Sequence, residues 1–232
     1  MGRKTLNARR WVIVGIALLA ILGVVATGLF VSSRSDSTES TQKQATKQSA
    51  PASSAAPKPD KDDPQLKGCL AEADDLMPNE ISIPELKLTS KVIPAGLDKE
   101  GRPAAPPKDD SQNFTWYNGS AKPGSASGNA LLNVHAYPNG KAVGNMLTSK
   151  NGLKPNQIIR VAGKGGKTVC YRVTKVQELR ISEYDVNNPK HIEWQRFADG
   201  PSRLVIITCK DRNAQTKKWD TRSVFWAERV SA

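Results

Sequence analysis

Short apolar runs separated by turn residues make up the pattern of the chain from Glu80 onward. Strand-forming residues fill the runs, and Pro, Gly and Asn stand between them, as in Lys122-Pro123-Gly124 and Pro138-Asn139-Gly140. Many short strands at this spacing predict an all-β sandwich or closed barrel. The expected strands are Ile81–Pro84, Leu86–Ile93, Asn129–His135, Gln157–Ala162, Thr168–Ile181, Arg203–Cys209 and Arg222–Val230.

Differences among these runs predict where each one lies in the sheet. Leu204–Ile207 is apolar at every position, which favours a strand covered on both faces. The strand that begins at Arg222 alternates in character, so we expect it closer to an edge or surface. Only residues 183–197 and 143–148 suggest short helices.

A longer apolar run, from Trp11 to Val31, contains no charged residue. At about 1.5 Å per residue its 21 residues cover about 32 Å, enough to cross the hydrocarbon core of a membrane. Residues 1–10 hold four basic side chains and no acidic one, so the positive-inside rule leaves them in the cytoplasm and the rest of the chain outside. A cleaved signal peptide is the alternative, but this run is longer and has no clean small-residue cleavage site.

Residues 32–79 separate the predicted anchor from the predicted domain, residues 80–232. Ser, Thr, Gln, Ala, Pro and Lys dominate up to residue 65 and cannot bury enough surface to offset their ordering entropy. We therefore expect a disordered extracellular linker, with a possible short helix around Leu70–Leu76.

The formal net charge of +12 restricts the class of partner. A basic excess remains beyond residue 65, which suits an anionic polymer, a lipid surface or simply a solvated face. The sequence has no helix-turn-helix, zinc-finger or RNA-binding signature, so we expect no nucleic-acid partner.

Three expected strand ends carry residues that could do chemistry together. Cys209 ends one strand, and Arg222 begins the next, so an antiparallel hairpin would place them side by side. His135 ends a third strand, just before a turn. A thiolate can attack a carbonyl, an imidazole can protonate the leaving amine, and a guanidinium can stabilise the oxyanion. Taken singly, each has a plainer reading as a small core residue, a strand-end residue or a surface charge.

The order and surroundings of these residues resemble the sortase family of cysteine transpeptidases. Ile206-Ile207-Thr208-Cys209 resembles the strand that carries the sortase nucleophile, with Arg222 on the following strand and Asn133-Val134-His135 upstream. Ile81–Leu86 fits the opening of the sortase domain, and Trp116-Tyr117 with Pro123-Gly124 and Gly128 looks most like the actinobacterial class F branch. Val134 stands where many sortases have Gly, which leaves the subclass open.

The resemblance implies a closed eight-stranded β-barrel with short helices and a reaction in two halves. The thiolate would cleave an LPXTG-like sorting signal between Thr and Gly, and an amine such as a cell-wall precursor would resolve the thioacyl enzyme. It implies His135, Cys209 and Arg222 as the catalytic residues, with Asn133, Ile207 and Thr208 beside the substrate. It also implies a monomer without a cofactor, although some sortases bind calcium through loop carboxylates.

Two further questions stay open on the sequence. If Cys209 is reserved for chemistry, Cys69 and Cys170 form the natural disulfide pair, but we expect two unpaired thiols instead. A hydrolase that uses water in place of the amine, or a non-catalytic basic barrel that binds the envelope, is the alternative function. A papain-like protease would need its Cys before its His, and this chain has the opposite order.

Overall fold

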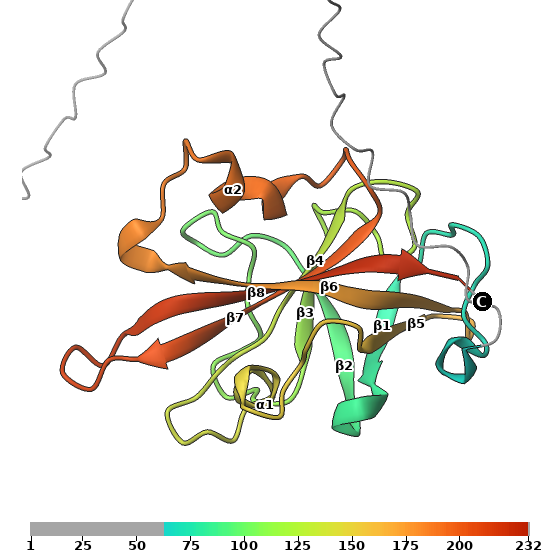
Figure 1. Ribbon diagram of the computed structural model, residues 1–232. Coiled ribbons are helices and arrows are strands. Elements are labelled where there is room, and N and C mark those ends of the chain that lie inside the picture. The colour runs from blue at the N-terminus through green and yellow to red at the C-terminus, as the bar shows by residue number, and fades with distance from the viewer. Residues whose placement is uncertain (1–62, 232) are drawn as a thin grey trace, which may run out of the picture. The chain divides into compact units, whose positions relative to one another are not determined.

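Alternating burial begins with the first strand, β1 (Pro78–Ile83), where Ile81 and Ile83 are fully buried and Glu80 is exposed. The computed structural model describes residues 63–231. Within that range eight strands close into a barrel in the order β1-β2-β3-β4-β7-β8-β6-β5 (Figure 1). The remaining strands are β2 (Leu88–Ala95), β3 (Phe114–Tyr117), β4 (Asn129–Asn133), β5 (Ile158–Gly163), β6 (Thr168–Arg180), β7 (Arg203–Arg212) and β8 (Trp219–Val230).

The sequence prediction of a closed eight-stranded barrel is confirmed. Seven of the strands match the expected runs, and β3 is the strand that the pattern did not show. Only four residues long, β3 offers too few positions for an alternation to be recognised. Its Phe114 and Trp116 are buried and contribute to the barrel interior.

Large apolar side chains from all eight strands fill the barrel interior. Each such side chain contributes about 1.5–3 kcal/mol when fully buried. A second cluster lies on the outer face of β4, β7 and β8, where it is covered by the connection between β6 and β7. Its fully buried members are Leu131, Val205, Val224 and Trp226.

The long strands β6, β7 and β8 run past the barrel, and β7 and β8 end in a hairpin that projects from it (Figure 1). Because β8 lies between β6 and β7, it is an interior strand of the sheet. The expectation that this strand lies near an edge is therefore wrong. Its alternating polar residues fall mostly near its two ends, whereas residues 223–227 are all buried.

Between residues 63 and 231 helical structure is limited to short segments, as expected for this part of the chain. The helix α1 (Val143–Thr148) has the predicted bounds. The region 183–197 is broken into α2 (Pro189–Ile192) and short 3-10 turns at Ile181–Glu183 and Glu193–Gln195. Pro189 starts a new helix there, and the Asn188 side chain caps it by accepting a hydrogen bond from the Lys190 amide.

Residues 63–79, which the sequence assigned to a disordered linker, lie against the barrel. Leu66, in a 3-10 turn at Pro64–Leu66, is 1% exposed and packs with Ile158 and Val230. No helix forms at Leu70–Leu76. Residues 63–79 therefore belong to the folded body, because this segment has its own buried contacts and a covalent link to β6.

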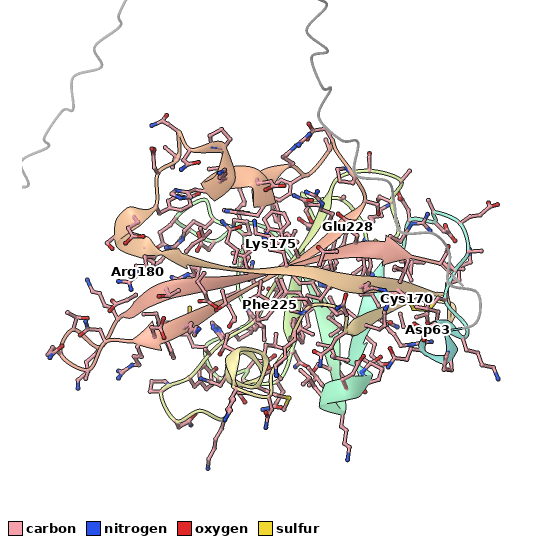
Figure 2. The ribbon with its side chains drawn as sticks, in the orientation of Figure 1. Asp63, Cys170, Lys175, Arg180, Phe225 and Glu228 are labelled. Carbon is pink, nitrogen blue, oxygen red and sulfur yellow. A yellow bond between two sulfur atoms is a disulfide. The ribbon has the colours of Figure 1, made fainter. Side chains whose placement is uncertain are left out.

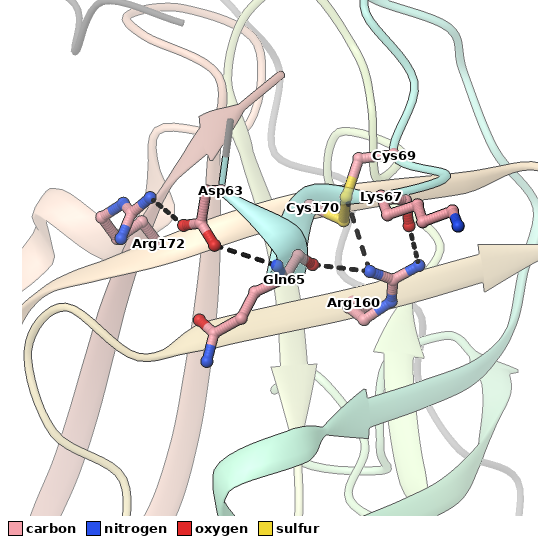
Figure 3. The surroundings of a disulfide bond; sticks show 7 residues. All are labelled: Asp63, Gln65, Lys67, Cys69, Arg160, Cys170 and Arg172. Carbon is pink, nitrogen blue, oxygen red and sulfur yellow. Dashed lines mark hydrogen bonds and ion pairs between the residues drawn. A yellow bond between two sulfur atoms is a disulfide. The ribbon is translucent and has the colours of Figure 1, made fainter. Parts of the chain in front are cut away.

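That link is a disulfide between Cys69 and Cys170, whose Cα atoms are 5.6 Å apart (Figure 3). It corrects the expectation of two unpaired thiols. The guanidinium of Arg160 supports it by donating hydrogen bonds to the carbonyls of Gln65 and Lys67, at 2.7 and 3.0 Å. The pairing joins residues far apart in sequence, so only the barrel could bring them together.

Residues 1–62, which include the predicted cytoplasmic segment, the predicted anchor and most of the predicted linker, lie outside the described residues. Between residues 63 and 231, no helix has the length and apolar character needed to cross a membrane.

Candidate active site

The candidate nucleophile Cys209 lies near the outer end of β7, where the strand leaves the barrel. Successive side chains of β7 point to opposite faces, so Leu204 and Ile206 enter the interior while Val205 and Ile207 face outward. Cys209 shares the outward face and is half-buried. The chain has three cysteines and two of them form the disulfide, so Cys209 holds the free thiol.

The candidate Arg222 lies directly opposite Cys209 in the β7–β8 register, as the expected hairpin requires. Burial raises the pKa of the Cys209 thiol, and the positive charge of Arg222 lowers it again without cancelling the rise. Arg222 donates one hydrogen bond, 3.3 Å long, to the carbonyl of Thr221. Among residues 63–231 no carboxylate forms an ion pair with it, so its guanidinium can still bind a substrate oxygen.

The third candidate, His135, reaches the same face through the parallel pairing of β4 with β7. Asn133 is paired with Ile207, and the Val134 amide continues the ladder by donating to the Ile207 carbonyl at 3.2 Å. The regular pairing of β4 ends at Asn133, two residues before His135. Continued at the same spacing, this register brings His135 beside Cys209, and Cys209 pairs with Arg222 on β8, which predicts a row of the three residues across adjacent segments.

The imidazole of His135 makes a contact with the connection between β2 and β3. Its Nε2 lies 2.7 Å from the carbonyl oxygen of Pro106. A carbonyl oxygen only accepts hydrogen bonds, so Nε2 carries the proton and Nδ1 is the basic nitrogen of the neutral ring. Asp110 lies nearby. Burial raises the pKa of Asp110, but hydrogen bonds from Asn113 and Gln112 and the charge of His135 outweigh burial and leave it lowered.

A groove of about 610 Å³ runs along the outer face beside this row. The strands β4, β7 and β8 form its floor, and the connection from β6 to β7 forms one wall. Arg222, Asn133 and Ile207 all line it. The rest of the lining is mainly apolar and aromatic, which suits an extended peptide with small or apolar side chains.

The structure separates the three residues expected beside the substrate. Asn133 and Ile207 line the groove. Thr208 is 2% exposed and faces the opposite side of β7, where its hydroxyl donates to the Val134 carbonyl at 3.0 Å. Thr208 thus ties the strand that carries Cys209 to the segment that carries His135.

Sequence reasoning missed the aromatic wall of the groove. Tyr117 and Phe197 meet edge to face with ring centroids 5.4 Å apart, and Trp194 packs beside Phe197. The sequence did contain a hint of this wall, since Trp194 and Phe197 are large apolar residues in a segment with few other core residues. Their position over β4 and β7 depends on the fold of the β6–β7 connection, which no local pattern predicts.

A second hollow, of about 540 Å³, adjoins the groove between the start of the β6–β7 connection and the β7–β8 hairpin. The two share Arg180 and Ile181 as a common wall, and Figure 2 shows Arg180 at the end of β6 that lies toward this hairpin. No group of three or more metal-ligating side chains occurs in the described part of the chain.

Comparison with known proteins agrees with this architecture. The sortase domain model matches residues 81–230. A search of curated protein sequences found no match. Among solved structures, Corynebacterium diphtheriae sortase A is 16% identical, with a TM-score of 0.49 over 68% of this chain and 63% of that one, so the match spans less than two thirds of that protein.

Two further structures show a similar likeness. Sortase C-1 of Actinomyces oris is 19% identical, with a TM-score of 0.46 over 68% of this chain and 76% of that one. Streptococcus agalactiae sortase C1, in complex with MTSET, is 14% identical, with a TM-score of 0.47 over 70% of this chain and 73% of that one. The family model covers well over half of the chain, and the chain belongs to the sortase family.

Proposed function

We propose that this protein is a membrane-anchored extracellular cysteine transpeptidase that cleaves an LPXTG-like sorting signal and joins the released carbonyl to a cell-wall or pilus amine. The family implies a cysteine transpeptidase that anchors surface proteins. One observation supports the proposal for this chain: the free thiol of Cys209 lies opposite Arg222, which has no carboxylate partner among residues 63–231 and lines a groove of peptide size.

In the first half-reaction His135 takes the proton of the Cys209 thiol, and the resulting thiolate attacks the carbonyl carbon between Thr and Gly of the signal. Arg222 stabilises the oxyanion that forms. The C–N bond then breaks, and His135 gives a proton to the departing amine. The product is a thioester between Cys209 and the threonine carbonyl.

In the second half-reaction an incoming amine attacks the thioester carbon. Its nitrogen loses a proton to His135, the C–S bond breaks, and the Cys209 thiolate that leaves takes this proton back from His135, which restores the resting thiol and imidazole. A hydrolase would follow the same path with water in place of the amine. The second hollow, which shares Arg180 and Ile181 with the groove, gives room for an acceptor next to the groove.

Intact mass spectrometry tests this proposal. The full chain in detergent micelles is incubated with LPXTG-type peptides, with and without an amine acceptor. We expect an acyl adduct on the wild type, a new peptide–amine product when the acceptor is present, and neither in Cys209→Ala. Adduct formation followed only by hydrolysis would support the hydrolase alternative.

If no peptide gives an adduct, the transpeptidase proposal fails for that class of signal. The remaining alternative, a basic envelope-binding barrel, then predicts binding to anionic wall polymer that weakens with salt and is unchanged in Cys209→Ala.

A further inference from the structure

Three outward-facing residues at the end of β4 contact one stretch of backbone. Asn133, His135 and Tyr137 are spaced two apart, and each places a side-chain donor on a carbonyl of the segment Pro103–Lys108, which we call the strap. The bonds run from Asn133 Nδ2 to the Pro103 and Ala104 oxygens at 3.3 and 3.4 Å, from His135 Nε2 to the Pro106 oxygen at 2.7 Å, and from the Tyr137 hydroxyl to the Lys108 oxygen.

The strap is suited to presenting carbonyls in fixed places. Pro106 and Pro107 lack amide hydrogens, and the proline that follows Pro106 restricts its backbone to extended conformations. Pro106 is buried against the barrel although its neighbours are exposed. The Thr115 hydroxyl holds the start of the strap by donating to the Ala104 oxygen at 2.7 Å.

Beyond the strap, the same connection is held against the chain that follows His135. The Val143 amide donates to the Ser111 oxygen at 2.9 Å, and the Gln112 side chain donates to the Lys141 oxygen at 3.4 Å. The connection is therefore held by hydrogen bonds on both sides of Pro106 that do not involve the imidazole.

We propose that Tyr137 and Asn133 are positioning residues, which hold the strap on the end of β4 so that the Pro106 carbonyl fixes the tautomer and orientation of His135. The inference rests on the proposed role of His135 as the proton-transfer partner of Cys209. The strap keeps the proton on Nε2 and leaves Nδ1 free to accept the thiol proton. It also stabilises the imidazolium that results, because a charged donor makes a stronger hydrogen bond than a neutral one.

The charges around His135 are compatible with this arrangement. Asp110 faces the imidazole from the β2–β3 connection, and Arg222 faces the neighbouring Cys209 from β8. Burial and the carboxylates of Asp109 and Asp110 raise the pKa of Tyr137, so its hydroxyl keeps its proton and remains a donor throughout the neutral and mildly alkaline range.

The test uses the full chain in detergent, labelled with ¹⁵N in its histidine rings. The chain has two histidines, so a His191→Gln spectrum assigns the signals of His135. We expect the neutral His135 ring to be the Nε2–H tautomer in the wild type. Tyr137→Phe, which removes only the hydroxyl, should give a mixture of tautomers.

Asn133→Asp provides a second variant of almost the same shape. Its carboxylate cannot donate a hydrogen bond and repels the two strap carbonyls, so this variant should also give a mixture of His135 tautomers. Tyr171→Phe is the matched control, because its hydroxyl accepts a hydrogen bond from the Gly124 amide at 2.7 Å on a different part of the barrel. That variant loses a buried hydroxyl contact and should leave the His135 signals unchanged.

Turnover supplies an independent readout. In Tyr137→Phe we expect kcat to fall about fivefold, the factor for one lost hydrogen bond, with KM nearly unchanged. If the His135 ¹⁵N signals of both Tyr137→Phe and Asn133→Asp are the same as in the wild type, the inference is overturned. An Nδ1–H tautomer in the wild type would also overturn it. The ring signals need no substrate, so this failure is distinct from failure of the transpeptidase proposal.

Discussion

Cys209, His135 and Arg222 come from three segments of the chain. Strand register pairs Cys209 with Arg222 and runs the strand before His135 alongside the strand that carries Cys209. The local environment then differs at each of them. The thiol is half-buried and its pKa is raised, the imidazole is hydrogen-bonded to a backbone carbonyl, and the guanidinium is free of carboxylate partners among the described residues. The resting site therefore holds mostly neutral thiol at neutral pH.

The pH dependence of Cys209 follows from the sign of that shift. Because burial raises the thiol pKa and Arg222 partly opposes it, alkylation by iodoacetamide should be slow at pH 7 and should increase up to alkaline pH. The pH at which the alkylation rate is half-maximal is its midpoint. Removing the positive charge in Arg222→Gln should move this midpoint to still higher pH. Intact mass measures the rate directly, since Cys209 is the free thiol of the chain.

Arg222→Lys is the control for charge. It should keep the midpoint close to that of the wild type, while kcat falls about tenfold or more because an ammonium cannot hold an oxyanion with the two-pronged geometry of a guanidinium. A midpoint in Arg222→Gln at or below that of the wild type would contradict the electrostatic role.

At the scale of elements, the β6–β7 connection decides the shape of the groove. It covers the outer cluster of β4, β7 and β8 with Trp194 and Phe197, and its far end is fastened to the start of β4. The Asn129 amide donates to the Arg196 oxygen at 2.8 Å, and the Gly128 amide donates to the Gly200 oxygen at 3.3 Å. These bonds place the aromatic wall over the strand that leads to His135.

Gly128 allows this close approach. Its φ is +83°, and a Cβ there would lie 2.3 Å from the Phe197 carbonyl oxygen. We expect Gly128→Ala to cost about 1–2 kcal/mol for the left-handed backbone and a further ~1–3 kcal/mol for the contact, and to raise KM by shifting the aromatic wall. Urea unfolding and peptide kinetics measure the two effects.

Gly165→Ala is the matched control, because its φ is +92° and nothing lies within 4 Å of the added Cβ. It should show the backbone cost alone, with unchanged KM. Equal destabilisation by the two substitutions would argue against a tight contact at Gly128.

At the scale of the molecule, the segment before β1 is fastened to the end of the barrel remote from the site. Cys170 and Leu179 both lie on β6, and Leu179 pairs with Arg222, so about 30 Å of strand separates the disulfide from the catalytic row. An ion pair between Asp63 and Arg172, at 3.1 Å, lies beside the disulfide (Figure 3). The first residues that the structure describes therefore lie away from the groove.

Removing the disulfide tests whether this end of the barrel contributes to stability without affecting the site. The double variant Cys69→Ser/Cys170→Ser should lose roughly 3–5 kcal/mol of unfolding free energy, as expected for a closed loop of about 100 residues. Its turnover, measured where it is still folded, should stay within about twofold of the wild type, because the site is remote from the change. Dithiothreitol should lower the stability of the wild type but not that of the variant. A large loss of turnover in the folded variant would show that the two ends of the barrel are coupled.

The amino-acid pattern alone predicted seven of the eight strands, because alternating and continuous apolar runs reflect local burial, and it pointed to Cys209, His135 and Arg222 through their order at strand ends. It did not determine the partner of Cys69, 101 residues away, or the direction of Thr208, or the strap that holds His135. The same is true of β8, whose alternation suggested an edge although β6 and β7 flank it. Each of these depends on contacts between segments distant in the chain, and only closure of the barrel brings those segments together.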